Sequence, residues 1–146
     1  MSNMLIQNAT MVLPNTTVVG DLLIENGQIT SIQPGGGIAV ENEIHTVDAT
    51  GLHLLPGIID PQVHFRDPGQ PEKEDLYTGS CAAASGGVTS FLDMPNNVPS
   101  QTTLQSMHEK IATGNQRCIT NFGFFIGATE FNVCLLYTSD AADEKV

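Results

Sequence analysis

The sequence has 146 residues, of which 40% are hydrophobic and 14% charged, a balance typical of a globular rather than a disordered protein. Sixteen acidic residues against five basic ones give a formal net charge of −11, which argues against a nucleic-acid surface. Neither a signal peptide at Met1 nor an apolar run of the roughly 20 residues that cross a bilayer is expected. Three cysteines without CxxC spacing predict reduced thiols in a cytoplasmic protein.

Short apolar runs separated by turn signals predict a small β module over residues 1–55. The pair Asn26-Gly27 stands between two β-prone runs, Asp21–Glu25 and Gln28–Ile32, and this arrangement predicts a hairpin. Pro34–Gly37 is expected to form a loop. Further strands are expected at 4–6, 10–13, 44–47 and 52–55.

After Pro56 the pattern changes to strands that alternate with helices. Strands are expected at 57–64, 88–94 and 119–126, and helices at 74–85 and 102–113, the second ended by Gly114-Asn115. This alternation predicts an α/β fold with right-handed parallel βαβ units. A closed eight-stranded (β/α)8 TIM barrel needs about 250 residues, so residues 56–133 would supply about its first three strands.

Residues 134–144 read CLLYTSDAADE and differ abruptly from the preceding text. This segment resembles the forward translation of a transposase adapter used in sequencing libraries. Residues 134–146 are therefore expected to be non-natural, and the natural protein would continue past Val133. The alternative is a genuine acidic tail.

A polar cluster follows the expected strand 57–64. If the strand conformation extended through this cluster, Gln62, His64 and Arg66 would share one face, with Val63 and Phe65 on the other. A potential metal ligand and a cation would then project together from the end of a buried strand. In a barrel of parallel strands, the carboxyl ends of the strands carry the active site.

Four segments together resemble dihydroorotase of the amidohydrolase superfamily. They are Pro56–Gly69, Lys73–Asp75, Gly86–Thr89 and Asp93–Pro99. The resemblance covers roughly residues 4–133. It implies a (β/α)8 barrel, a flanking β-sandwich built from both chain ends, and zinc at the strand tips. The implied activity is reversible hydrolysis of the cyclic amide of dihydroorotate to N-carbamoyl-aspartate, in pyrimidine synthesis.

By this resemblance His64 matches the second histidine of the family's His-x-His metal motif and would be a zinc ligand; the alternative is a buried histidine bonded to a backbone carbonyl. Gln62 stands where the family has the first histidine, and an amide oxygen is a weaker donor to zinc than imidazole. Three interpretations of Gln62 stay open: fewer protein ligands, an impaired site, or a hydrogen bond to a metal-bound water.

The resemblance also assigns substrate binding to Arg66 and Asn96, which would hold the substrate carboxylate. The alternatives are a surface ion pair of Arg66 with Asp67 or Glu72, and a turn role for Asn96 beside Pro95 and Pro99.

Several other polar residues have simpler interpretations. Asp60 is expected either to orient the motif or to make a strand-end turn. His45 and His53 are expected at the surface or in packing, His108 in solvent, and Cys81 and Cys118 as buried small hydrophobes. No serine has a histidine and an acid at triad-like positions.

The predicted function is that of a cytoplasmic, zinc-dependent cyclic amidohydrolase that takes a small carboxylate-bearing substrate. The alternatives are an allantoinase- or hydantoinase-like enzyme, or a non-catalytic homologue that is a structural partner of aspartate carbamoyltransferase; a homo-oligomer is the other assembly considered. No catalytic residue is expected within this chain, because the other family residues belong on later strands. The chain alone is therefore expected to be inactive. Its open sheet edge and uncovered apolar face are expected to make it aggregate or fold partly.

Overall fold

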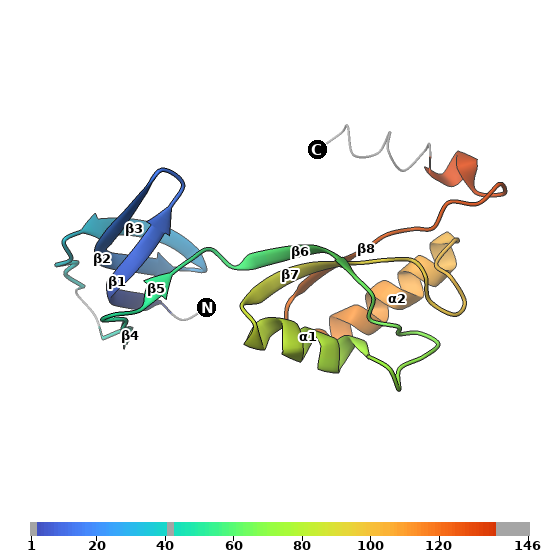
Figure 1. Cartoon of the computed structure of the whole chain (residues 1–146), viewed down its shortest axis with the longest axis horizontal. Helices are drawn as coiled ribbons and strands as arrows, with labels where there is room; N and C mark the ends of the chain where they lie inside the picture. Colours follow the sequence, from blue (N-terminus) through green and yellow to red (C-terminus); the bar gives the residue numbers. More distant parts are fainter. Residues whose placement is uncertain (1–2, 41–42, 137–146) are drawn as a thin grey trace. The chain divides into compact units, whose positions relative to one another are not determined.

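A computed structural model describes residues 3–40 and 43–136 of the chain (Figure 1). The chain divides into two compact units, Met1–Pro56 and Gly57–Val146. The segment 134–146, for which a non-natural origin is expected, lies outside the described residues from position 137 onward.

The first unit is a five-stranded sheet. Its strands are β1 (Met4–Leu13), β2 (Thr16–Glu25), β3 (Gln28–Pro34), β4 (His45–Asp48) and β5 (His53–Leu54). They run in the order β3-β2-β1-β4, and β5 also pairs with β1. β1, β2 and β3 are antiparallel neighbours, whereas β4 and β5 lie parallel to β1.

The hairpin predicted at Asn26-Gly27 is confirmed. Both residues have positive φ, 54° and 79°, as the tight turn between two twisted strands requires. The two short strands expected at 4–6 and 10–13 are one continuous strand, whose register shifts between Ile6 and Ala9. β2 begins five residues before the expected Asp21, because Thr16 already pairs with Leu13 across a two-residue turn.

Apolar side chains from three segments of this unit form its core. The fully buried members are Ala9, Met11, Leu22 and Ala49. Beside them the carboxylate of Asp21, 2% exposed, accepts hydrogen bonds from the backbone N–H groups of Asn8, Gly37 and Ile38 at 3.0, 2.8 and 3.2 Å. Asp21 therefore fixes the glycine-rich loop after β3 to the β1 irregularity.

The second unit has the alternating order that the sequence predicts. Its elements are β6 (Ile58–Val63), α1 (Leu76–Ser85), β7 (Val88–Asp93), α2 (Leu104–Arg117) and β8 (Asn121–Phe124). The strands form a parallel sheet in the order β6-β7-β8. α1 and α2 contact each other and pack on β7 and β8, on the same side of the sheet (Figure 1).

Both helices begin at a capping box, two residues later than expected. At α1 the Asp75 side chain accepts from the backbone N–H of Thr78, and the Thr78 side chain accepts from the backbone N–H of Asp75. At α2 Thr103 and Ser106 make the same pair of hydrogen bonds. α2 does not end at Gly114-Asn115 as expected but continues to Arg117. A Cβ on Gly114 would lie 2.7 Å from the Phe122 ring, so this glycine lets the helix approach β8 rather than ending it.

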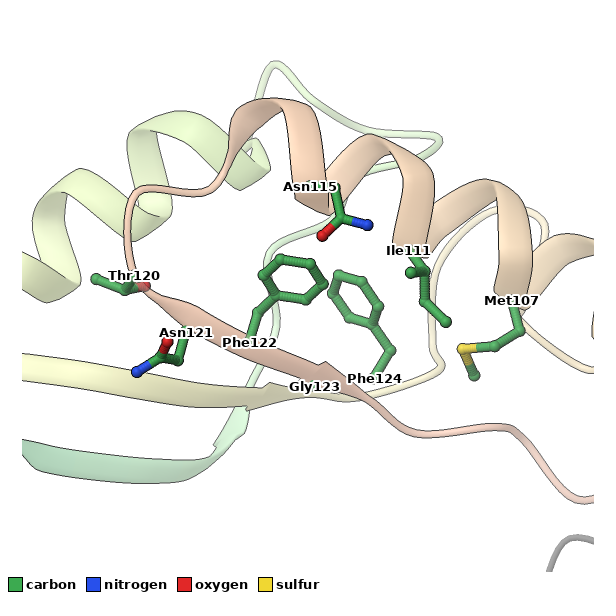
Figure 2. A pocket seen from close by; sticks show the side chains of 8 residues that line it. All are labelled: Met107, Ile111, Asn115, Thr120, Asn121, Phe122, Gly123 and Phe124. Carbon is green, nitrogen blue, oxygen red and sulfur yellow. The ribbon is translucent and has the colours of Figure 1, made fainter. Parts of the chain in front are cut away.

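Aromatic rings fill the space between the sheet and the helices. Phe65 and Phe91 have ring centroids 4.7 Å apart, and Phe122 and Phe124 have centroids 5.0 Å apart. Figure 2 shows the last two rings rising from β8 toward α2, where they line an open groove of about 460 Å³ with Met107 and Ile111.

β6 is an edge strand, and the expectation that it is buried was wrong for the described part of the chain. Ile58 and Ile59 are 54% and 65% exposed, because no described element covers the outer edge of β6. The expected strand 119–126 is also shorter, at Asn121–Phe124. Such uncovered apolar residues agree with the expectation of aggregation, which stays a prediction.

Candidate functional site

His64 and Asn96 meet at the carboxyl ends of two neighbouring parallel strands. His64 is the first residue after β6, and Asn96 lies three residues after the end of β7. The Nδ1 atom of His64 is 3.0 Å from the Oδ1 atom of Asn96, and both side chains are exposed. The contact joins residues that are 32 positions apart in the sequence.

This contact determines which atoms of the pair remain available. In the neutral tautomer that fits an acceptor oxygen at this place, Nδ1 of His64 carries the proton and donates to Oδ1 of Asn96, and Nε2 keeps a free lone pair. The Nδ2 group of Asn96 is then left with two donors. A lone pair suited to a cation and donors suited to a carboxylate therefore lie side by side.

Arg66 does not continue the strand face on which it was expected. β6 ends at Val63, its register shifts between Asp60 and Val63, and Arg66 has a φ of 28°. The backbone N–H of Asp67 donates to the carbonyl of Phe65, closing a three-residue turn around Arg66. The shared strand face predicted for Gln62, His64 and Arg66 was therefore wrong, since a turn replaces the extended chain.

The alternative role considered for Arg66 is not seen either. Within residues 3–40 and 43–136 the Arg66 side chain makes no ion pair, and Asp67 is paired with Arg117 instead. Arg66 is a half-buried residue two positions after His64, and its guanidinium donors have no partner among the described residues.

Gln62 and Asp60 are linked by a local contact within β6. The backbone N–H of Gln62 donates to Oδ1 of Asp60 at 3.1 Å, where the pairing of β6 with β7 shifts register. The side chain of Gln62 is exposed and has no hydrogen-bond partner within ranges 3–40 and 43–136.

A buried polar network lies beneath the loops that carry these residues. The ammonium of Lys110, on α2, is 2.7 Å from Oδ2 of Asp93, 2.7 Å from Oδ1 of Asn97 and 3.3 Å from Oε1 of Gln101. It also lies 4.8 Å from the centroid of the Phe124 ring. Burial lowers the pKa of Lys110 below its ordinary value, and the hydrogen bond and charge of Asp93 oppose that shift.

A second ion-pair cluster holds the turn after Arg66. Arg117, at the end of α2, donates to Asp67 at 2.6 Å and to Asp75 at 3.1 Å. Asp75 is also the N-cap of α1, and the Thr78 backbone N–H is the main reason that its pKa is lowered. The end of α2 is thereby tied to the start of α1.

The remaining histidines and cysteines lie outside this cluster. His45, His53 and His108 are exposed, as expected. Cys81 and Cys118 were expected to be buried but are half-buried, because Cys81 lies off the buried stripe of α1 and Cys118 caps the end of α2. Burial raises the pKa of the Cys118 thiol to about 11, which keeps it unreactive.

The described residues do not by themselves make a zinc site. No group of three His, Cys, Asp or Glu side chains that could hold a metal occurs in ranges 3–40 and 43–136. His64 offers one imidazole, and structural and catalytic zinc sites use three or four protein ligands.

The sequence pattern missed the buried network, although one signal was present. Asp93 is a charged residue at the carboxyl end of a strand, close to the strand-end position that drew attention to His64. Lys110 lies in an amphipathic helix and is one of only five basic residues, but nothing local predicts that its ammonium is buried.

Comparison with known proteins places these features in a family. A sequence profile of the amidohydrolase family matches residues 53–141. The chain belongs to the amidohydrolase family. The matched range contains the three parallel strands and both helices, and it includes part of the segment 134–146.

Individual amidohydrolases agree with this assignment. A dihydroorotase from Methanosarcina acetivorans is 40% identical over 124 residues, which are 85% of this chain and 26% of that protein. An allantoinase from Deinococcus radiodurans is 36% identical over 132 residues, 90% of this chain and 29% of that protein. The chain therefore spans about a quarter of the length of the curated relatives it matches.

A solved structure shows the same fold. The L-hydantoinase (dihydropyrimidinase) from Arthrobacter aurescens superimposes with a TM-score of 0.86 and 26% identity, covering 97% of this chain and 31% of that one. The parallel β6-β7-β8 sheet with its two helices is thus a partial TIM barrel, as the sequence predicted. Among the described residues, no helix combines the length and apolar character that a membrane span requires.

Proposed function

We propose that this amidohydrolase, in its complete form, hydrolyses the cyclic amide of dihydroorotate to N-carbamoyl-aspartate. The contact between His64 and Asn96 is the observation that carries the proposal. It leaves the amide donors of Asn96 available, and the guanidinium of Arg66 follows His64 on the same loop; together these groups suit a carboxylate on a small ring. Several relatives about 40% identical are dihydroorotases, which supports the same substrate.

In this proposal the chain's own residues bind and orient the substrate. Arg66 would grip the carboxylate through two parallel hydrogen bonds, and Asn96 would donate a third from Nδ2. His64 would present its Nε2 lone pair next to the ring. None of these three residues is assigned a role in proton transfer.

Zinc enters the proposal only as a cofactor of the complete protein. Metal dependence is typical of the family, and Nε2 of His64 is the atom free to bind a metal. Gln62 is a doubtful ligand, because an amide oxygen is a weak donor to zinc. A cytoplasmic location, consistent with the free thiols of Cys81 and Cys118, is part of the same proposal.

Two other functions have an observation in their favour. An allantoinase- or hydantoinase-like activity is supported by the relatives with those names. A non-catalytic role as a partner of aspartate carbamoyltransferase is supported by Gln62, which stands where a metal-binding imidazole is expected.

Steady-state kinetics of the protein expressed from its complete reading frame would test the proposal. The parent should turn over dihydroorotate, and Arg66→Met should raise KM by about 10- to 100-fold, because hydrogen bonds to a charged group are lost. Lys73→Met is the matched control, since Lys73 is an exposed base whose ammonium contacts only Gln70 among the described residues. It should leave KM unchanged.

The same assay separates the alternatives. Unsubstituted hydantoin and allantoin carry no carboxylate, so turnover of either without turnover of dihydroorotate would contradict the proposal. Absence of turnover together with absence of stoichiometric zinc, and co-purification with aspartate carbamoyltransferase, would favour the non-catalytic role.

A further inference from the structure

Lys110 is a buried cation on a helix that contributes nothing directly to the candidate site. It lies in the middle of α2, and its side chain is 1% exposed. All three oxygen atoms around the ammonium come from buried residues, namely Asp93, Asn97 and Gln101. A group so completely enclosed cannot itself contact a substrate.

Asp93 links the Lys110 ammonium by hydrogen bonds to the turn that bears His64 and Arg66. Its Oδ2 atom accepts from Lys110, and its Oδ1 atom accepts from the backbone N–H of Phe65 at 3.0 Å. Phe65 stands between His64 and Arg66 in the sequence. The ammonium therefore fixes the carboxylate that fixes the backbone of this turn.

Asn97 links the same ammonium to the loop that bears Asn96. Its Oδ1 atom accepts from Lys110 at 2.7 Å, and its Nδ2 group donates to the Pro68 carbonyl at 3.4 Å. Asn97 directly follows Asn96. The residues adjacent to both partners of the His64 and Asn96 contact are thus held by one ammonium group.

We propose that Lys110 is a positioning residue that sets the distance between His64 and Asn96 and the direction of Arg66. Only the expected change in KM rests on the proposed function; the positioning of His64 and Asn96 does not. A buried ion pair is weak evidence of stabilisation, because apolar residues of similar volume often fill such a place as well. Apolar residues in that place could not hold the backbone of one loop and the side chain of the next at fixed hydrogen-bond distances.

The test compares variants of the protein expressed from its complete reading frame. Lys110→Met alone leaves Asp93 buried and unpaired and can prevent folding. The double variant Lys110→Met with Asp93→Asn removes both charges together, so a folded protein is expected. Lys73→Met again serves as the control, since it removes an exposed ammonium and leaves the network intact.

Two measurements do not depend on catalysis. In the double variant the ¹⁵N shifts of the His64 ring should move away from those of the parent, because the hydrogen bond to Asn96 loosens. The Phe65 amide should exchange with solvent faster, whereas the Phe91 amide within β7 should keep its rate. The control should match the parent in both.

Kinetics then connects positioning to the reaction. KM for dihydroorotate should rise by about tenfold or more in the double variant, the range seen when supporting residues of a site are removed. A folded double variant with unchanged His64 shifts, or with changed shifts and the parental KM, would overturn the proposal. Loss of the native far-UV circular dichroism in the double variant would overturn it too, since the network would then serve folding. If the shifts change but the parent does not turn over dihydroorotate, positioning is supported and the proposed function fails.

Discussion

The interiors of the two units are built from different kinds of residue. In the described part of the first unit the buried side chains are apolar apart from Asp21, whereas in that of the second unit only Leu76 and Phe91 are buried hydrophobic residues. The buried polar residues of the second unit are Asp67, Ser80, Asp93, Asn97, Gln101, Lys110 and Asn132. Most of these lie on the loops after β6 and β7 or on the helix that supports them.

The buried carboxylates of the two units also accept hydrogen bonds from different kinds of partner. Asp21 directs its acceptors to backbone N–H groups of its own module and stabilises a loop. Asp93 divides its acceptors between a backbone amide next to His64 and a cation on a helix. Burial of apolar area stabilises without fixing direction, but hydrogen bonds fix direction as well, which a binding site needs.

The largest effect is expected from breaking the polar network of the second unit. In the protein expressed from its complete reading frame, Asp93→Ala leaves the Lys110 ammonium buried without its carboxylate and should lower the free energy of unfolding of this unit by about 3–5 kcal/mol. Hydrogen exchange followed by mass spectrometry should show faster exchange in peptides from β7 and α2 but not from β1 and β2. Asp60→Ala, which removes only a local contact, is the control. Equal loosening of both units would refute the idea that the network belongs to the second.

A comparable change in the apolar core should affect the other unit. Met11 is 1% exposed, and Met11→Ala should destabilise the first unit by about 2–5 kcal/mol because a cavity replaces the side chain. Exchange should then rise in β1 and β2 peptides and stay at the parental rate in α2. Ile29→Ala is the control, since Ile29 is 61% exposed and should cost less than about 0.5 kcal/mol. A larger effect of Ile29→Ala than of Met11→Ala would contradict this assignment of the core.

A smaller effect is expected from acid on the first unit, through Asp21. Three backbone N–H groups, with that of Asn8 first, hold the pKa of Asp21 below its ordinary value of 3.8 in the folded chain. The stability that this carboxylate contributes is fully present above that value and is lost as the pH falls through the lower folded pKa.

The Asp21→Asn variant provides the measurement for this pH dependence. The urea midpoint of the parent should exceed that of Asp21→Asn at pH 6. The difference should shrink as the pH falls below 3.8, because the carboxylate then binds a proton more readily in the unfolded chain than in the folded one. Asp48→Asn is a suitable comparison, because the pKa of Asp48 is lowered chiefly by Thr50 on the surface. If the difference between parent and Asp21→Asn instead grew toward low pH, the ionised Asp21 carboxylate would not be the stabilising form.

Local patterns predicted most elements of both units. The Asn26-Gly27 hairpin and the alternation of strands and helices depend on residues within a few positions of one another, so each is visible in a short window. Where the predicted end of a helix was wrong, a distant contact decided the true one. Gly114 looked like a helix end, but its lack of a side chain serves the approach of α2 to the Phe122 ring.

The sequence by itself determined the order of the elements, the family resemblance and the presence of His64, Arg66 and Asn96 near strand ends. Only the tertiary structure decided that His64 meets Asn96, that Arg66 lies in a turn and that Lys110 is buried. The contact of His64 with Asn96 joins residues 32 positions apart, and that of Lys110 with Asp93 joins residues 17 apart. Periodicity reports which face a residue occupies within one element, whereas hydrogen bonds between elements depend on how strands and helices pack after the chain has folded.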